Sequence, residues 1–191
     1  NIMNLSDNIK NAFNVVVKTY DNVLKLMNYC DEVAESMGYV PVTDKFLRQR
    51  SDLNTNGWLY RSLFKIYQDK NDILIEGSEL REGPIYSIEF NFEDEPVCCI
   101  GKFEYENMMG FKKQISPGDS WLFYYPTLPG DNRLDFFKID SEYTYSVPKE
   151  KYKSSYWGLN RAIFRCTDLT QINSENLNTI IFGEFNILKN K

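Results

Sequence analysis

Hydrophobic residues near the start of the chain recur three or four positions apart, which is the spacing of one face of an α-helix. They are Ile9, Phe13, Val16, Tyr20, Val23, Leu24, Met27, Ala34 and Met37. Ser6 or Asp7 suits the start of such a helix, and Gly38 suits its end. The pattern predicts an amphipathic helix over about residues 7–37, roughly 45 Å long at 1.5 Å per residue. Because this exceeds the width of the domain it would cover, we expect a kink or an overhanging end.

A strict alternation of apolar and polar residues follows in two runs, over 86–92 and 97–105, separated by an acidic turn at 93–96. Pairing the runs across that four-residue turn sets four apolar pairs on one face: Phe92 with Val97, Phe90 with Cys99, Ile88 with Gly101, and Tyr86 with Phe103. The pattern predicts an antiparallel hairpin with one buried face and its acidic side chains in water.

The remaining segments have weaker patterns. A short helix is predicted at 45–50. Residues 58–67 fit either a helix or a strand, and their few β-branched side chains favour the helix. A second hairpin is predicted from strands at 121–125 and 134–139, around a turn rich in Pro and Gly.

Two further strands and a final helix complete the prediction. The strands are placed at 143–147 and 156–167. Asn173 has the features of a helix N-cap, because Ile172 before it and Leu177 four residues after it form a hydrophobic staple. We expect the helix to span 174–182 and to stop at Gly183.

These elements predict one α+β domain over residues 1–191. In it, a long N-terminal helix packs on a mainly antiparallel sheet of about five to seven strands, followed by a short C-terminal helix. The helical N-terminal part is expected within 1–50, and the sheet within 84–167.

Composition narrows the possible chemistry. The 191 residues contain no histidine, which excludes Ser-His and Cys-His nucleophile pairs and His-coordinated metals. A net charge of −5 argues against broad nucleic-acid binding. No segment resembles a membrane span. Four cysteines without a metal-binding spacing indicate a reduced, cytoplasmic protein with its cysteines packed in the core. The frequent Asn, Lys and Ile indicate a bacterial source.

One group of residues could support catalysis. In the predicted hairpin Glu89 lies diagonal to Lys102, and Glu104 continues along the same polar face. Two carboxylates and a lysine on adjacent strands could hold Mg²⁺ and activate a water in a hydrolase or nuclease. The order Lys102-Phe103-Glu104 is the reverse of the acid-x-Lys order that restriction-type nucleases use, so an ordinary cross-strand ion pair is the competing interpretation.

Exposed aromatic residues would instead form a binding surface, because Tyr and Trp contribute large rigid area with a polar tip. The candidates are Trp121, Tyr124, Tyr125 and Trp157. The competing interpretation places these rings in the core. In the same way, the apolar stripe of the long helix either covers the sheet or pairs with another subunit.

The sequence therefore predicts a non-catalytic cytoplasmic bacterial protein that binds a protein partner or its own copy, with no cofactor, no metal and no membrane contact. The alternative is the Mg²⁺-dependent hydrolase of Glu89, Lys102 and Glu104. A third possibility is a small-ligand pocket lined by aromatic residues between helix and sheet.

Overall fold

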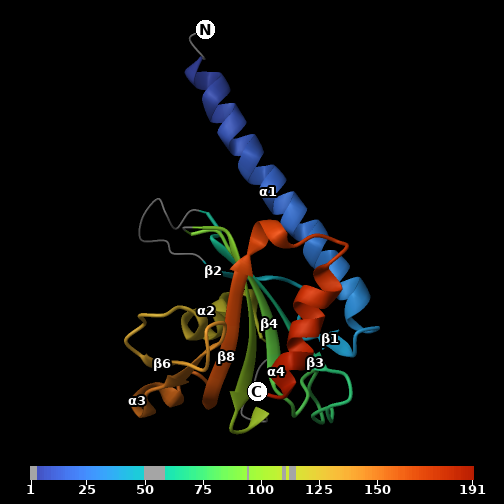
Figure 1. The fold of residues 1–191 in the computed structure, drawn as a ribbon, viewed down its shortest axis with the longest axis vertical. Coiled ribbons are helices and arrows are strands. Elements are labelled where there is room, and N and C mark those ends of the chain that lie inside the picture. Colours follow the sequence, from blue (N-terminus) through green and yellow to red (C-terminus); the bar gives the residue numbers. More distant parts are fainter. Residues whose placement is uncertain (1–3, 50–58, 94, 109–110, 112–114) are drawn as a thin grey trace.

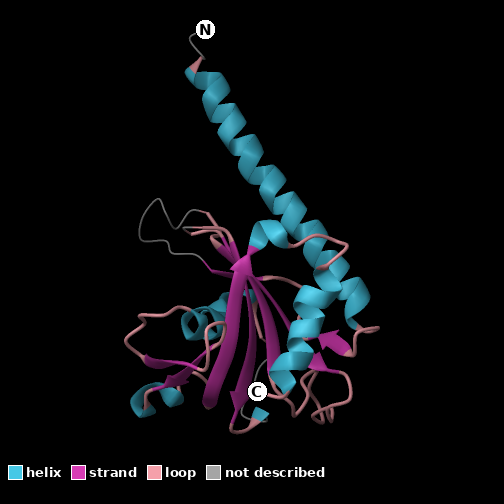
Figure 2. Cartoon of the chain, in the orientation of Figure 1, coloured by secondary structure: helices cyan, strands magenta, loops and turns pink. Residues whose placement is uncertain are grey.

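The computed structural model describes residues 4–49, 59–93, 95–108, 111 and 115–191. It confirms the α+β class: a long N-terminal helix, one antiparallel sheet and a short C-terminal helix (Figures 1 and 2). The structure has more strands near the N-terminus than the sequence predicted.

Helix α1 spans Leu5–Ala34, and its first turn is capped by the Asn4 side chain, which accepts a hydrogen bond from the Ser6 amide. The helix is continuous, so the predicted overhang is correct and the predicted kink is not. Its N-terminal half projects beyond the rest of the chain (Figure 1). A turn at residues 35–38 ends it, and Gly38 adopts a positive φ of 91° that favours glycine.

The sheet contains eight strands in the described residues, and every pairing is antiparallel. The strands are β1 Tyr39–Pro41, β2 Leu47–Gln49, β3 Ser62–Asp69, β4 Ile85–Asn91, β5 Val97–Tyr105, β6 Leu134–Lys138, β7 Thr144–Pro148 and β8 Leu159–Asp168. Their order is β1-β3-β4-β5-β8-β7-β6, with β2 paired to β3.

Three predictions on the N-terminal side of the sheet were wrong. The sheet begins at Tyr39 rather than near residue 84. The helix predicted at 45–50 is replaced by β2, and the helix preferred for 58–67 is replaced by β3. In β3 seven consecutive residues are buried, Ser62–Gln68. Two-sided burial removes the alternation that would have identified a strand.

The sheet is covered on both faces. One face, which we call the helix face, carries Tyr67, Tyr86, Ile88, Phe90 and Ile100 and packs against α1 and the C-terminal helices. The opposite face, which we call the loop face, carries Phe64, Ile66, Ile85, Phe103 and Ala162 and packs under the segments that connect the later strands. A hairpin with one solvated face was therefore the wrong expectation.

The register of the β4–β5 hairpin also differs from the prediction. Phe90 lies opposite Cys98 and Ile88 opposite Ile100, all on the helix face, while Cys99 lies opposite Glu89 on the loop face. Phe90 and Cys99 thus point to opposite sides of the sheet. The shift by one residue is allowed because both faces bury apolar side chains, so Cys98 and Ile100 gain a core of their own.

Residues 121–125 form helix rather than the predicted strand. A 3₁₀ turn η3 at Pro117–Ser120 leads into helix α2 at Trp121–Tyr124 and a second turn η4 at Tyr125–Thr127. Ser116 and Asp119 form a capping box ahead of α2, and Pro117 occupies the first helical position. The strand β6 predicted within 134–139 does form, but it pairs with β7.

The C-terminal helices cover the helix face. In the sequence, β8 is preceded by helix α3, Glu150–Lys153, and followed by turn η5, Leu169–Gln171. Asn173 caps as predicted, because its Oδ1 accepts hydrogen bonds from the amides of Glu175 and Asn176. The helix does not stop at Gly183: a π-helical turn η6, Asn178–Phe182, passes directly into α4, Gly183–Lys189. Phe185 of α4 packs 5.0 Å from the Tyr39 ring and 5.1 Å from the Tyr86 ring, measured between centroids.

Two of the four cysteines are bonded, contrary to the expectation of four unpaired thiols. Cys99 and Cys166 lie opposite each other on β5 and β8 and form a disulfide with a Cα–Cα distance of 4.0 Å. Cys166 is exposed, whereas Cys99 is buried. Cys30 and Cys98 are free and buried, and burial raises the pKa of Cys30 to about 12, so this thiol stays protonated.

Candidate functional site

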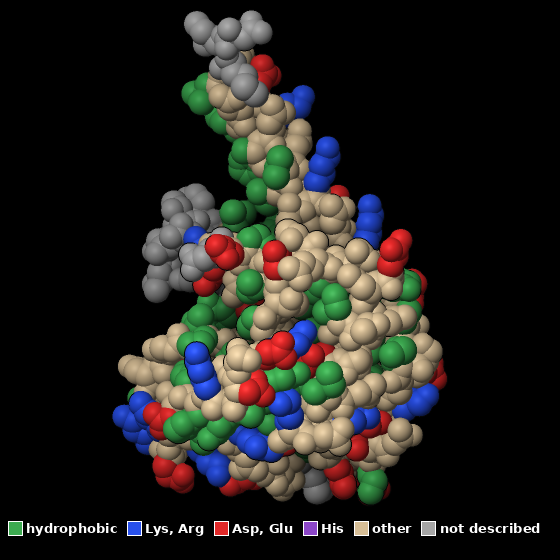
Figure 3. Space-filling model, viewed as in Figure 1, with side chains coloured by type: hydrophobic (Ala, Val, Ile, Leu, Met, Phe, Trp, Pro, Cys, Tyr) green, Lys and Arg blue, Asp and Glu red, His purple; other side chains and the backbone are tan. Residues whose placement is uncertain are grey.

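The projecting half of α1 presents an apolar surface to solvent. Leu5 is 72% exposed, Ile9 53% and Phe13 67%, although large apolar side chains usually lie inside. Hydrophobic side chains follow one side of the projecting helix down to the body of the molecule (Figure 3). Near the other end of the same helix, Val23 and Met27 are buried against the sheet. One helix therefore has a half that is covered by its own chain and a half that is not.

The exposed and buried halves belong to one continuous seam. Its members are Ile9, Phe13, Val16, Tyr20, Val23, Met27, Cys30 and Ala34. They alternate steps of four and three residues without interruption, which is the heptad spacing of a helix that packs along its whole length. From Val23 onward the seam is buried by the sheet and the C-terminal helices. From Tyr20 back to Ile9 the same pattern continues with no described element of this chain beside it except at its base.

At that base a groove of about 280 Å³ separates α1 from the end of the sheet. Its walls are formed by Val15, Val16, Thr19, Tyr20, Leu59, Tyr60, Arg61, Phe92 and Glu93. The Tyr20 hydroxyl donates to the Tyr60 carbonyl at 2.8 Å and fixes the angle at which the helix leaves the body. Leu59 on the opposite wall is 48% exposed. The groove extends the apolar surface of the helix onto the sheet.

A buried polar network holds the lower half of α1. Lys65 of β3 is 2% exposed, and its ammonium group lies 2.7 Å from Asp31 of α1 and 2.7 Å from the Thr43 carbonyl. Tyr67 donates to the other oxygen of Asp31 at 2.8 Å. These contacts satisfy the buried charge and tie the helix to the sheet at one position along its length. The direction of the projecting half is thereby set by the sheet.

The three residues of the predicted catalytic group do not meet. Glu89 lies on the loop face of β4, while Lys102 and Glu104 lie on the helix face of β5, so the sheet separates them. Lys102 and Glu104 form an ion pair within β5, at 2.8 Å, in place of the expected cross-strand pair of Glu89 and Lys102, and Arg161 of β8 contacts Glu104 from the neighbouring strand. The Mg²⁺ site built on all three residues is therefore excluded by geometry.

Glu89 is instead a buried acid with no cationic partner among the described residues. It is 2% exposed, and one carboxylate oxygen accepts hydrogen bonds from Ser62 at 2.7 Å and Asn91 at 3.1 Å. Burial raises its pKa to about 7, against the opposing effect of these hydrogen bonds. The second oxygen lies 3.0 Å from the Thr127 hydroxyl, which itself lies 2.9 Å from the Tyr124 carbonyl. A proton on this second oxygen satisfies both contacts, because Glu89 then donates to Thr127 and Thr127 to Tyr124.

The four aromatic residues predicted as a binding surface cover the loop face of the sheet. Tyr124 is buried, and its hydroxyl donates to Glu93 at 2.9 Å. The other three, Trp121, Tyr125 and Trp157, are partly buried and pack against the same core. Arg133 stacks 3.9 Å above the Tyr125 ring. The burial of these rings agrees better with core packing than with an exposed binding surface.

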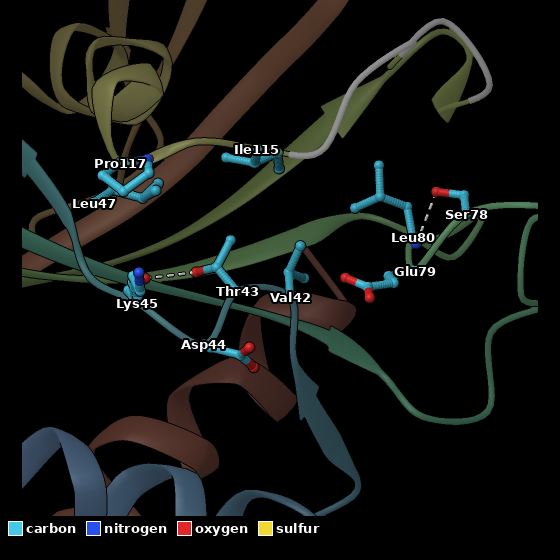
Figure 4. A pocket seen from close by; sticks show the side chains of 10 residues that line it. All are labelled: Val42, Thr43, Asp44, Lys45, Leu47, Ser78, Glu79, Leu80, Ile115 and Pro117. Carbon is cyan, nitrogen blue, oxygen red and sulfur yellow. Dashed lines mark hydrogen bonds between the residues drawn. The ribbon is translucent and has the colours of Figure 1, made fainter.

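A smaller cavity of about 240 Å³ lies between the segment after β1, the 78–80 loop and the segment before η3 (Figure 4). Its apolar side chains include Leu47, Leu80 and Ile115, and its polar ones include Asp44 and Glu79. The Thr43 hydroxyl and the Ser78 hydroxyl are both engaged with their own loops. Its volume is below the usual range of ligand pockets, about 300–1,000 Å³, and it lacks the aromatic lining of the predicted ligand pocket.

The sequence pattern identified the α1 stripe as a whole and gave two alternatives for it, covering the sheet or pairing with another subunit. The signal that distinguishes the halves was present in the length of the helix, because 30 residues extend about 45 Å at 1.5 Å each. The surface that remains free could not be located without the position of the sheet.

Among the described residues, no group of three or more acidic or cysteine side chains could hold a metal ion. In that same part of the chain no helix combines the length and the apolar character needed to span a membrane. Comparisons of the chain with protein-family models, with curated proteins and with solved structures find no match.

Proposed function

We propose that this chain is a non-catalytic binding protein and that the projecting half of α1, together with the groove at its base, docks an apolar helical surface of a protein partner, either a different protein or a second copy of this chain. The observation that carries the proposal is the uninterrupted heptad seam, half buried by the sheet and half exposed. Two contacting helices bury such a seam by knobs-into-holes packing.

The energetics of an isolated helix support this proposal. In proteins, packing of the apolar face provides most of the stability of a helix. Residues Leu5–Tyr20 receive little such packing from this chain. A partner that covers Ile9 and Phe13 would provide it.

The compartment remains a prediction. Cytoplasmic localisation and a bacterial source were inferred from composition, and the Cys99–Cys166 disulfide removes one ground for the cytoplasm, because stable disulfides are typical of oxidising compartments.

Site-specific photocrosslinking tests the proposed docking surface. We expect p-benzoylphenylalanine at position 13, in the cells from which the gene derives, to give a discrete covalent adduct, because Phe13 lies in the exposed seam. The same photoprobe at position 18 is the matched control: Lys18 is exposed on the opposite side of the same helix and should give no discrete adduct. Equal adducts at both positions, or none at position 13, would contradict the proposal.

A further inference from the structure

We infer that the protein docked on α1 is a second copy of this chain, with the two projecting helices antiparallel about a twofold axis that passes between Asn14 and Val15. This inference rests on the proposed function and names the partner of the same surface.

The spacing of the exposed seam is the first argument. Ile9, Phe13, Val16 and Tyr20 are separated by four, three and four residues, so the spacing reads the same in both directions. In an antiparallel pair, Ile9 therefore lies level with Tyr20 of the second copy, and Phe13 lies level with its Val16. Each layer joins a larger side chain to a smaller one, which suits close packing. A parallel pair would stack Phe13 on Phe13 and Tyr20 on Tyr20.

The distribution of charge is the second argument. Within Leu5–Tyr20 the charged residues are Asp7, Lys10 and Lys18. At 100° per residue, Asp7 and Lys18 point away from the seam and Lys10 lies at its edge. The flank that faces the groove carries Leu5, Asn8, Ala12, Val15 and Thr19, none of which is charged. Such a surface packs best against another uncharged surface, because no charge is then buried without a partner. The same helix of a second copy presents one.

The antiparallel direction is also favoured electrostatically, because it opposes the two helix dipoles. In this arrangement the two Lys10 side chains are about 13 Å apart along the axis, at 1.5 Å per residue. That separation exceeds the Debye length of about 8 Å at physiological salt, so their repulsion is screened.

The groove provides the third argument, because it lies where the end of the second helix arrives. Ile9 of the second copy is level with Tyr20, whose side chain lines the groove beside Leu59 and Phe92. Each copy offers one helix end and one groove, as an isologous dimer requires.

The surface is large enough for a weak dimer. An enclosed aromatic side chain buries about 150–250 Å², so two Phe13 rings at 67% exposure provide roughly 200–330 Å². With Leu5, Ile9, Val16 and Tyr20 of both copies, the total reaches the order of 1,000 Å², the lower limit for a specific interface. We therefore expect a dimer with an affinity in the micromolar range.

Sedimentation equilibrium tests the self-association. The wild-type chain is expected to pass from monomer to dimer across the micromolar range. Phe13→Glu should weaken the dimer by roughly a hundredfold or more, because two unpaired carboxylates would be buried in the seam. Asn14→Glu adds the same charge one residue along, on the outer side of the helix, and should leave the dimer unchanged. A wild-type chain that stays monomeric to 1 mM, about three decades above that range, would overturn the inference.

Engineered cysteines test the direction of pairing. An equal mixture of Phe13→Cys and a size-tagged Val16→Cys chain is expected to form mainly the mixed disulfide, because these positions are level in the antiparallel pair. Disulfides between identical chains would show a parallel pair and overturn the stated geometry. Asn14→Cys, on the outer side, is the control and should remain unlinked.

The photocrosslinking adduct at position 13 separates the two proposals. An adduct of twice the mass of the chain supports self-pairing. An adduct with a different protein, from a chain that is monomeric in sedimentation, overturns self-pairing and leaves the docking function standing. Absence of any adduct at position 13 contradicts both.

Discussion

Removal of the Cys99–Cys166 bridge by the double substitution Cys99→Ala, Cys166→Ala is expected to lower the free energy of unfolding by about 4 kcal/mol. The bridge closes a loop of 67 residues in sequence, and opening it restores conformational entropy to the unfolded chain. The expected change is a large share of the total stability of a typical domain, about 5–15 kcal/mol. Urea unfolding followed by far-ultraviolet circular dichroism measures it.

Two controls isolate the effect of the bridge. A reductant should destabilise the wild-type chain to the level of the double variant, since Cys166 is exposed and can be reached by a thiol, and it should not affect the double variant. Cys98→Ala truncates a buried neighbour of Cys99 without opening a bridge and should cost about 1 kcal/mol. Four free thiols in the unfolded, unreduced chain, in place of two, would show that the bridge does not form.

Glu89→Gln is expected to stabilise the protein above neutral pH by up to about 3 kcal/mol, with little effect at pH 4. The pKa of Glu89 in the folded chain is about 7, whereas its ordinary value is 4.5. The folded chain therefore binds more protons than the unfolded chain between these two values, so the contribution of Glu89 to stability declines as pH rises through this window. A difference of 2.5 pKa units corresponds to about 3 kcal/mol. Glutamine keeps an acceptor for Ser62 and a donor for Thr127 and does not ionise.

The measurement is the difference in unfolding free energy between wild type and Glu89→Gln at several pH values from 4 to 8. Glu104→Gln is the matched control with the opposite sign. Partial burial raises the pKa of Glu104, but hydrogen bonds from Arg161 and Lys102 outweigh it and lower the pKa overall. Its contribution is therefore present above about pH 4.5 and is lost on acidification, so Glu104→Gln should destabilise the chain at pH 7. If the difference in unfolding free energy between wild type and Glu89→Gln did not change with pH, Glu89 would not be a buried acid that is neutral at low pH and ionises near pH 7.

Local signals predicted several elements correctly, because in each the determining contacts lie within a few residues. The stripe of α1 and the Asn173 cap are examples. The helix at Trp121–Tyr124 carried a local signal that was overlooked, since Ser116, Pro117 and Asp119 together mark a helix start.

Other features had no local signal. Residues 62–68 are buried on both faces of β3, so neither a helical nor a strand period distinguishes them. The β4–β5 register depends on which segments cover each face. With one face in water the apolar rings would align as predicted, but with both faces covered Cys98 and Cys99 are both buried, on opposite faces of the sheet. The catalytic group of Glu89, Lys102 and Glu104 depended on that register and was lost with it.

The amino-acid sequence by itself determined the α+β class, the long amphipathic helix and the absence of histidine chemistry, because these depend on composition and on the short-range period of apolar residues. The tertiary structure alone decided which half of α1 is free, which cysteines meet and how Glu89 is buried. Each of these depends on contacts between segments far apart in the chain, and no local pattern specifies the distance between two such segments.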